Sequence, residues 1–557
     1  MGDTPAFDFA SFRAAQEDQN TAALAASGIN QAAADVVAAA KSSSSASTSK
    51  AKAPAPRKKA APKRKSEAVE PAEPRVGTRR STRGSTMAAG AKDEEEKRRI
   101  EAEALAQRER EEAEAKAERD RLKHGDRDIT AETGVTGSGD TGELLATLKE
   151  VAILDESDKD EWELGKSPAP ESKKLTSLTE PLELRAIVKV IPDRIYSMTA
   201  HPDPQRHLVF SGDKGGHISL WDCTNAGHKL PSANGAIRDA KMAGADEEEE
   251  KDDDEEYQWG KWWVWKGHLG SSVSCLKFRP GVKDEIYSCS YDATLRTHHF
   301  ERGFSEEVID ADQWSDEALL HTFDFDPTGN EIWASDHNGG LIWRDLREAK
   351  DKAKRWSIDG HKVGCISLNP ANPDMAVSSH LKRAMRLWDL SALRGLPEDT
   401  DIDEVVEKAC LHEYSYEKAC TSAYFDPTGT RLASTCYDDA IRIWDIQPQK
   451  MSGYAEGNKW KYSQRILHNC QVGAYVTVLR ARWSTASAYP PHLHIGDMAR
   501  TLDIYSPDST RSKIFTDESI TAVPAVTASH PTVGGMYWGG AASGKVSYWT
   551  APLAEDE

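Results

Sequence analysis

The sequence predicts an all-β fold, a β-propeller of seven four-stranded WD-repeat blades over residues 186–553, preceded by a long charged tail. Three observations lead to this fold class. Seven strand-like segments end in Trp-Asp or a worn copy of it, most of them carry a turn rich in Asp or Gly, and they recur every 44 to 77 residues. A WD-type blade needs ~40 to 45 residues, so the longer spacings mark inserted loops.

The clearest repeat copies end in Leu-Trp-Asp or Ile-Trp-Asp, as in HLVFSGDKGGHISLWD (207–222) and TRLASTCYDDAIRIWD (430–445). Across the seven copies, the Trp position holds Trp221, His298, Arg344, Trp388, Trp444, Tyr505 and Trp549. Two copies retain the Gly-His that opens a blade, with His268 and His361. In this repeat, a His before the first strand and an Asp in a later turn brace the Trp, so we expect both histidines to be structural.

Residues 1–185 are predicted to form a disordered tail with a basic segment at 50–84 and a charged helix at 93–124. Between residues 50 and 83 there are twelve Lys or Arg against three Glu, and proline and glycine keep them solvated. This indicates either a nuclear import signal with a phosphate contact or a plain basic linker. The import residues would be Arg57, Lys58, Lys59, Lys63, Arg64 and Lys65.

An acidic insertion at 225–257 separates the first two repeat copies. It contains DEEEEKDDDEE (246–256), and such a run is expected to be disordered because its charges repel one another. It is a solvating loop or a contact for basic, histone-like proteins. The formal net charge of −20 argues against attraction of the whole molecule to nucleic acid, although local charge decides phosphate binding.

No catalytic motif is present: there is no Walker loop, nucleophile elbow or HExxH. The eight cysteines show no metal-ligand spacing and are predicted to be buried thiols. No signal peptide and no apolar run of ~18 residues is found. We therefore expect a soluble intracellular binding protein, not an enzyme, without cofactor, metal, membrane contact or small-molecule substrate.

Four segments resemble the fungal damaged-DNA-binding WD-repeat family and, more distantly, the small subunit of the UV-damaged-DNA-binding complex. His298-His299 and Trp343-Arg344-Asp345 are unusual departures from the general WD pattern that the family shares. The resemblance implies nuclear binding to single- and double-stranded DNA with a preference for UV-damaged duplex, and a role in DNA repair or metabolism. The resembling segments are 258–280, 290–301, 324–347 and 360–370.

The candidate DNA-binding residues cluster in two loops that converge on one mouth of the predicted ring. The turn HLKRAMR places Lys382 and Arg383 where a bracing Asp usually stands, with Arg386 shortly after and Lys362 in the adjacent loop. Cations at a bracing position favour DNA contact over a solvated turn. In the distant relative, a loop inserts an aromatic wedge into damaged DNA, and Gly473, Ala474 and Tyr475 align with that loop.

Tyr475 is therefore the candidate wedge, the alternative being that it only packs the loop. Wedge insertion costs a few kcal/mol of unstacking, which a lesion has already partly lost. Arg480 and Arg482 alternate with apolar residues and are predicted to face the same way, for phosphate contact or for salt bridges.

A second docking signal is Asp345-Leu346-Arg347, which resembles the motif by which some propellers dock on the cullin-4 ligase adaptor. A structural ion pair between Asp345 and Arg347 is the alternative. Two competing functions follow: a chromatin-associated scaffold that uses the acidic insertion, and a substrate receptor of a cullin-type ubiquitin ligase.

Overall fold

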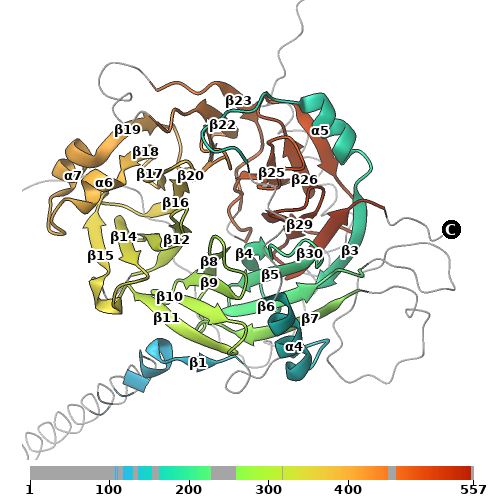
Figure 1. Ribbon diagram of the computed structural model, residues 1–557, viewed down its shortest axis with the longest axis horizontal. Coiled ribbons are helices and arrows are strands. Elements are labelled where there is room, and N and C mark those ends of the chain that lie inside the picture. The colour runs from blue at the N-terminus through green and yellow to red at the C-terminus, as the bar shows by residue number, and fades with distance from the viewer. Residues whose placement is uncertain are drawn as a thin grey trace, which may run out of the picture. The chain divides into compact units, whose positions relative to one another are not determined.

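The computed structural model describes residues 107, 110, 114, 117–118, 120–129, 136–152, 162–226, 259–315, 318–449, 460–473 and 475–552. Within them, seven antiparallel sheets surround a central axis as the blades of a propeller (Figure 1). The basic segment 50–84 with its import residues, and the acidic run 246–256, lie outside the described residues.

The first three blades follow the chain from the sheet strand nearest the axis outward. Blade 1 holds β4 (Ile195–Ala200), β5 (Leu208–Asp213), β6 (His217–Asp222) and β7 (Lys261–Lys266). Blade 2 holds β8 (Val273–Phe278), β9 (Glu285–Ser290), β10 (Thr294–His299) and β11 (Phe304–Asp310). Blade 3 holds β12 (Leu320–Phe325), β13 (Glu331–Asp336), β14 (Gly340–Asp345) and β15 (Lys354–Ser357), with the short helix η2 (Lys350–Lys352).

Blades 4 to 6 repeat this order. Blade 4 holds β16 (Val363–Asn369), β17 (Asn372–His380), β18 (Ala384–Asp389) and β19 (Cys410–Ser415), with helices α6 (Leu390–Arg394) and α7 (Ile402–Ala409) before β19. Blade 5 holds β20 (Cys420–Phe425), β21 (Arg431–Cys436), β22 (Ala440–Asp445) and β23 (Gln464–Leu467). Blade 6 holds β24 (Arg482–Trp483), β25 (Leu493–Asp497), β26 (Thr501–Tyr505) and β27 (Arg511–Phe515).

Blade 7 closes the ring with strands from both ends of the propeller sequence. Its first three strands are β28 (Val526–Ser529), β29 (Tyr537–Gly540) and β30 (Lys545–Thr550), and its outer strand is β3 (Glu183–Lys189). In the β3–β30 pairing, Glu183 lies opposite Thr550 and Lys189 opposite Lys545. Strand β28 also packs against β4 of blade 1. The closing strand thus begins slightly before residue 186.

The seven repeat positions that the sequence indicates are confirmed. Each of them is the fifth residue of the third strand of its blade, from Trp221 in β6 to Trp549 in β30. Trp221, Trp388 and Trp444 are fully buried. Hydrophobic clusters fill the spaces between neighbouring blades, as a closed ring of twisted sheets requires.

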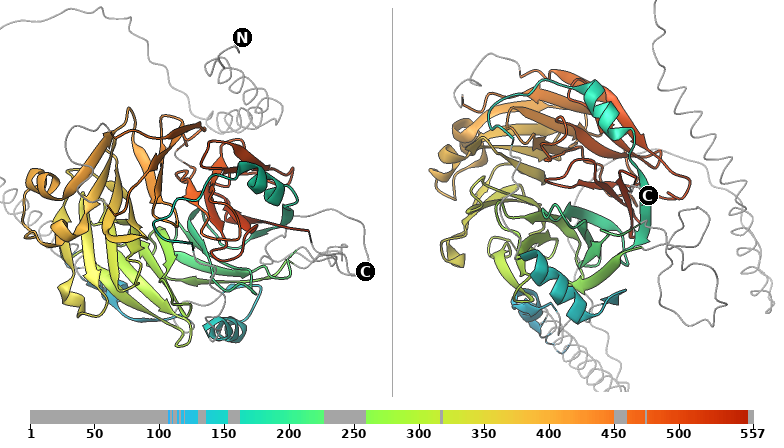
Figure 2. Two further views of the ribbon diagram at one scale, coloured as in Figure 1. Left: turned by 45° about the horizontal axis from the view of Figure 1, so that its top comes forward. Right: turned by 45° about the vertical axis from the view of Figure 1, so that its right-hand side comes forward.

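Part of the predicted tail is ordered against the propeller, so the expected disorder through residue 185 is wrong for the described residues there. Strand β1 (Arg127–Asp128) extends blade 2 and β2 (Thr136–Gly137) extends blade 1, each as a fifth strand. Helices α4 (Thr141–Ala152) and α5 (Ser172–Thr179) pack on the outside of the ring (Figures 1 and 2). The described residues of the predicted helix 93–124 before Gly125 are helical.

Helix α4 shows why this segment folds. Leu144, Leu148 and Val151 recur on one face of the helix and are fully buried in a cluster with Trp263 and Trp265 of blade 1. Too few apolar residues lie in this stretch to form a core of their own. Among the described residues, no helix is both long and apolar enough to span a bilayer.

Candidate functional site

The propeller has an opening at each end, and a different set of loops surrounds each opening. The loops that lead into the first strand of each blade, together with the turns between second and third strands, form what we name the d–a mouth. The opposite opening, formed by the loops after first and third strands, is the a–b mouth. The candidate DNA-binding residues lie on or next to the loops of the d–a mouth, apart from Arg482, while Asp345 and Arg347 lie at the a–b mouth.

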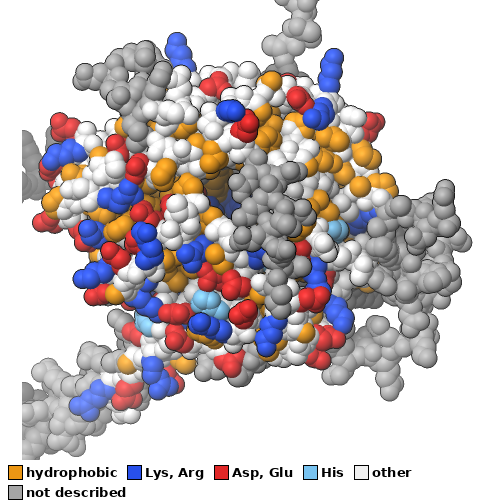
Figure 3. Space-filling model, in the orientation of Figure 1, with side chains coloured by type: hydrophobic (Ala, Val, Ile, Leu, Met, Phe, Trp, Pro, Cys, Tyr) orange, Lys and Arg blue, Asp and Glu red, His pale blue; other side chains and the backbone are white. Residues whose placement is uncertain are grey.

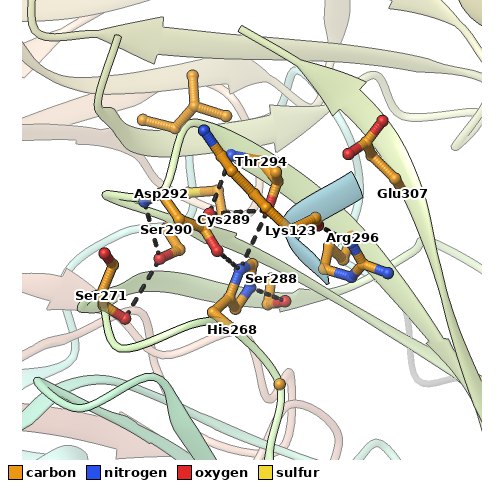
Figure 4. Close-up of polar contacts among 12 residues, drawn as sticks. Lys123, His268, Ser271, Ser288, Cys289, Ser290, Asp292, Thr294, Arg296 and Glu307 are labelled. Carbon is orange, nitrogen blue, oxygen red and sulfur yellow. Dashed lines mark hydrogen bonds and ion pairs between the residues drawn. The ribbon is translucent and has the colours of Figure 1, made fainter. Parts of the chain in front are cut away.

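Blade 2 contains the bracing network that the sequence predicts for His268 (Figure 4). The Nδ1 of His268 lies 3.0 Å from an Asp292 carboxylate oxygen, and its Nε2 lies 2.7 Å from the Ser288 hydroxyl. The Ser288 hydroxyl is 2.8 Å from Nε2 of His298, which stands at the Trp position. Burial lowers the pKa of both histidines, which favours their neutral forms in the core. His268 is structural, as predicted.

In blade 4 the acid of the brace comes from the loop before the first strand and the histidine from the second strand. This is the reverse of blade 2. The acid is Asp359, in the loop before β16, and its Oδ2 lies 3.1 Å from Nδ1 of His380 at the end of β17. The Ser378 hydroxyl lies 2.7 Å from Nε2 of His380 and accepts a hydrogen bond from Nε1 of Trp388 at 2.7 Å. The prediction that His361 is the brace is wrong, because its side chain is 57% exposed.

Because Asp359 supplies the acid from the loop before β16, the turn after β17 needs no acidic residue. Lys382 and Arg383 are both exposed. Arg383 adopts a φ of 66°, and its carbonyl accepts a hydrogen bond from the backbone N–H of Tyr416 at 2.7 Å. The N–H of Leu381 donates to the carbonyl of Lys362 at 3.0 Å. A well-anchored turn therefore holds two solvated cations at the rim, where packing does not require them.

Unlike Lys382 and Arg383, Arg386 has a side chain that is held by other residues. This corrects its assignment as a DNA-binding residue. Its Nε lies 2.7 Å from Glu413 and its Nη1 lies 3.2 Å from Asp359. The same Nη1 donates to the carbonyl of Ile358 at 2.8 Å. These contacts hold the guanidinium in the bracing network of blade 4.

Lys362 and Arg480 lie deeper in the d–a mouth than the rim cations. Each comes just before the first strand of its blade, and both are only partly exposed. Burial and then the charge of Arg480 lower the pKa of Lys362 to about 8. Arg480 therefore lies within electrostatic reach of Lys362 and makes it harder to keep Lys362 charged.

The loop before blade 6 holds Tyr475 above this mouth. The side chain of Tyr475 is 86% exposed, which makes it the most exposed large hydrophobic residue of the described chain. On one side of it, Nε2 of Gln471 donates to Asp439 of blade 5 at 2.6 Å. On the other, the hydroxyl of Thr477 donates to the carbonyl of Ile195 of blade 1 at 2.6 Å. The loop is thus tied at both ends while Tyr475 projects into solvent; Ala474 lies outside the described residues.

Arg482 reaches the other end of the channel from Arg480. Its guanidinium lies over the Tyr424 ring, 5.7 Å from the centroid. It also lines a cavity of about 990 Å³ together with Pro280, Pro370 and Pro427 from the loops of the a–b mouth. Arg482 therefore does not belong to the rim where DNA contact was expected.

Asp345 and Arg347 form an ion pair with each other at the a–b mouth. Nε of Arg347 donates to Oδ1 of Asp345 at 2.8 Å, and this pairing lowers the pKa of the carboxyl. The Arg347 side chain is 65% exposed. The structural ion pair, which was the alternative to docking on a ligase adaptor, is therefore present in the loop.

Aromatic residues that the sequence analysis missed line the d–a mouth. Tyr196 and Tyr291 meet edge to face with centroids 6.2 Å apart, and Tyr291 meets His321 at 4.9 Å. Arg194 lies over the Tyr196 ring at 5.0 Å. Each stands near the start of a first strand or in the turn after a second strand, so the repeat register could have found them.

Among the described residues, neither cluster that could hold a metal ion is free of cationic partners. Two groups of His and Asp lie close enough to share an ion, but Lys123 pairs with Asp312 in one, and Arg511 pairs with Asp503 in the other. On the one face drawn in Figure 3, Lys and Arg side chains are interspersed with Asp and Glu, so no single-sign surface is seen on that face.

Comparison with known proteins adds family relationships to this geometry. The WD domain, G-beta repeat, matches residues 408–445, which reach from the end of α7 through β22. A DNA damage-binding protein CMR1 of Cryptococcus neoformans var. neoformans serotype D is 30% identical over 437 residues, covering 68% of this chain and 72% of the relative. Proteins of the same name from Mycosarcoma maydis and Aspergillus oryzae are each 28% identical, covering 77% and 88% of this chain, and 84% and 90% of their own lengths.

Proposed function

Because the chain belongs to the family of fungal DNA damage-binding proteins named CMR1, we propose that it binds DNA, and that it does so at the d–a mouth of the propeller. The observation that carries this proposal is the turn of blade 4. Lys382 and Arg383 are exposed, held by an anchored backbone, and relieved of any bracing role by Asp359. Solvated cations of this kind are what phosphate contacts use.

The same proposal gives Tyr475 the role of a wedge. An aromatic ring that is 86% exposed on a loop tied to blades 1 and 5 can enter a base step without reorganising its support. A damaged step has lost part of its stacking, so insertion costs less there than in intact duplex. Preference for UV-damaged duplex then arises without reading of base edges. The protein acts as a binding protein in the nucleus, and the basic segment 50–84 serves as its import signal.

Replacing Lys382 by Gln and Arg383 by Asn should weaken binding to every duplex, damaged or intact. Asn tolerates the positive φ of Arg383, so the double variant removes charge without straining the turn. We expect a loss on the order of tenfold and a salt slope reduced by about 2. Titrations of the full-length chain at two salt concentrations measure both.

The matched control is Lys352→Glu, which changes the net charge by the same amount in η2, at the a–b mouth. An unchanged salt slope in the double variant, or an equal change in the control, would contradict DNA contact at the d–a mouth.

Tyr475→Ala should mainly reduce the preference for damaged over intact duplex, by several fold, because the stacking surface is lost while the phosphate contacts remain. Tyr475→Phe should keep the preference, since it retains the ring. Competition between irradiated and intact duplex of one sequence measures the ratio. An equal loss on both duplexes would assign Tyr475 a general contact and remove its role as a wedge.

A further inference from the structure

Two cations in the d–a mouth stand without an acidic partner, although both are withdrawn from the surface. In the described part of the chain, no hydrogen bond or ion pair engages the ammonium of Lys362 or the guanidinium of Arg480. By contrast, Arg442 is paired with Asp438 and Lys277 with Asp324. Cations taken out of water generally need such a partner.

Three tyrosine hydroxyls lie near Arg480. Tyr291 follows β9, Tyr424 lies in β20 and Tyr437 follows β21, and all three lie within the electrostatic reach of Arg480. Within the described residues, none of their hydroxyls takes part in a hydrogen bond. Burial raises the pKa of Tyr291 and of Tyr424 to about 12, so both stay protonated and able to donate.

We propose that Lys362, Arg480, Tyr291, Tyr424 and Tyr437 form a binding site for one compact oxyanion, a phosphate or diphosphate group. The donors come from the inner ends of blades 2, 4, 5 and 6, and converge on the channel. A guanidinium fork with an ammonium and neutral hydroxyls matches the several oxygens of a phosphoryl group. An anion here would also remove the repulsion between the two cations.

The proposed oxyanion site is less exposed than the rim cations. Lys382 and Arg383 are exposed and can meet a phosphate backbone that passes over the mouth, whereas Lys362 and Arg480 are only partly exposed. The oxyanion has two sources: a phosphate group of DNA that enters the mouth, or a free phosphorylated small molecule. The first source rests on the proposed function, and the second is independent of it.

Calorimetric titration of the full-length chain with inorganic pyrophosphate, at fixed ionic strength, tests the site. We expect one molecule bound per chain, and at least a tenfold loss of affinity in Arg480→Gln and in Lys362→Met. Tyr291→Phe should give a smaller loss, and Lys352→Glu none. Absence of binding to the unaltered chain, or binding that survives both cation variants, would overturn the proposal.

Thermal unfolding distinguishes this site from a structural role of the same residues. Without pyrophosphate, Lys362→Met should leave the unfolding midpoint unchanged or raise it, because it relieves the repulsion by Arg480. Pyrophosphate should raise the midpoint of the unaltered chain and not that of the variant. A lowered midpoint for Lys362→Met without ligand would indicate a structural cation and contradict the proposal.

Proton uptake gives an independent readout. Lys362 lies within electrostatic reach of Arg480 and His321; burial keeps His321 neutral. A bound anion raises the pKa of Lys362, so at pH 8.5 this side chain should take up a fraction of a proton on binding. Titrations in buffers of different ionisation enthalpy measure the net proton transfer, to which pyrophosphate contributes through its own ionisation. Lys362→Met should lack the uptake, and an equal net transfer in the unaltered chain and in this variant would contradict the site.

Competition with duplex DNA separates the two sources. If pyrophosphate displaces duplex and Arg480→Gln weakens both ligands, the oxyanion is a phosphate of DNA. If pyrophosphate binds and duplex binding is unaffected, the ligand is a free phosphorylated compound. Failure of pyrophosphate to bind sinks this site alone, since the proposed function is tested separately by the Lys382 and Arg383 double variant.

Discussion

Deleting residues 1–152 should strongly destabilise the propeller, although every blade keeps its four strands. The deletion uncovers a cluster in which Ile129, Leu144, Leu148 and Val151 are at most 2% exposed. Burying one such side chain contributes about 1.5 to 3 kcal/mol, so the four together contribute roughly 6 kcal/mol or more.

The same deletion removes two hydrogen-bond partners of a buried arginine. Nη1 and Nη2 of Arg296 donate to the carbonyls of Lys123 and Gly125 at 3.0 and 2.6 Å. Arg296 is fully buried and would keep only the hydroxyl and the carbonyl of Ser305 as partners. Thermal and urea unfolding measure the loss.

Deleting residues 1–94 is the matched control, since it removes none of these contacts. It should leave the unfolding midpoint unchanged. Equal stability of the two truncated chains would show that the 120–152 segment does not belong to the folded unit. For this reason DNA binding is best measured on the full-length chain, because a cut at residue 185 would also remove part of the closing strand β3.

Asp359→Asn should cost on the order of 3 kcal/mol, because it breaks the exchanged brace of blade 4. The Asp359 side chain is 1% exposed, and its Oδ2 lies 3.1 Å from Nδ1 of His380 and 3.2 Å from Nη1 of Arg386. Without its charge, the guanidinium of Arg386 keeps only Glu413 as an ionic partner. Urea unfolding measures the change, and Asp399→Asn, an exposed acid of the same blade, is the control. A loss below 1 kcal/mol would show that the exchanged brace does not hold the blade.

The pH dependence of the same variant gives a second check. His380, Arg386 and the hydrogen bond from the N–H of His361 lower the pKa of Asp359 to about 2, against the burial that raises it. A carboxyl with a lowered pKa stabilises the fold above its unfolded pKa of ~3.9, and this stabilisation is lost as the pH falls toward 2. Asp359→Asn should therefore flatten the decline in stability between pH 4 and pH 2; an identical decline would contradict the assignment.

Most of the candidate site could be located from the sequence, but its chemistry could not. The repeat register places Lys362, Lys382, Arg383 and Arg480 near the loops of one mouth, since each residue has a fixed place relative to its strand. It could not show that Arg386 is bound to Asp359 and Glu413, or that Arg482 lines the opposite opening. Contacts with residues on other strands cannot be read from the local sequence pattern.

The sequence by itself determined the seven blades, because a buried aromatic or its substitute recurs at the fifth position of every third strand. It also determined the brace of blade 2, where His268 and Asp292 stand at their usual places. Only the tertiary structure decided that blade 4 exchanges these roles, that β3 closes blade 7, and that residues 120–129 and 136–152 fold. Periodicity records which face of a strand is buried, whereas pairing between distant segments depends on which surfaces the closed ring leaves uncovered.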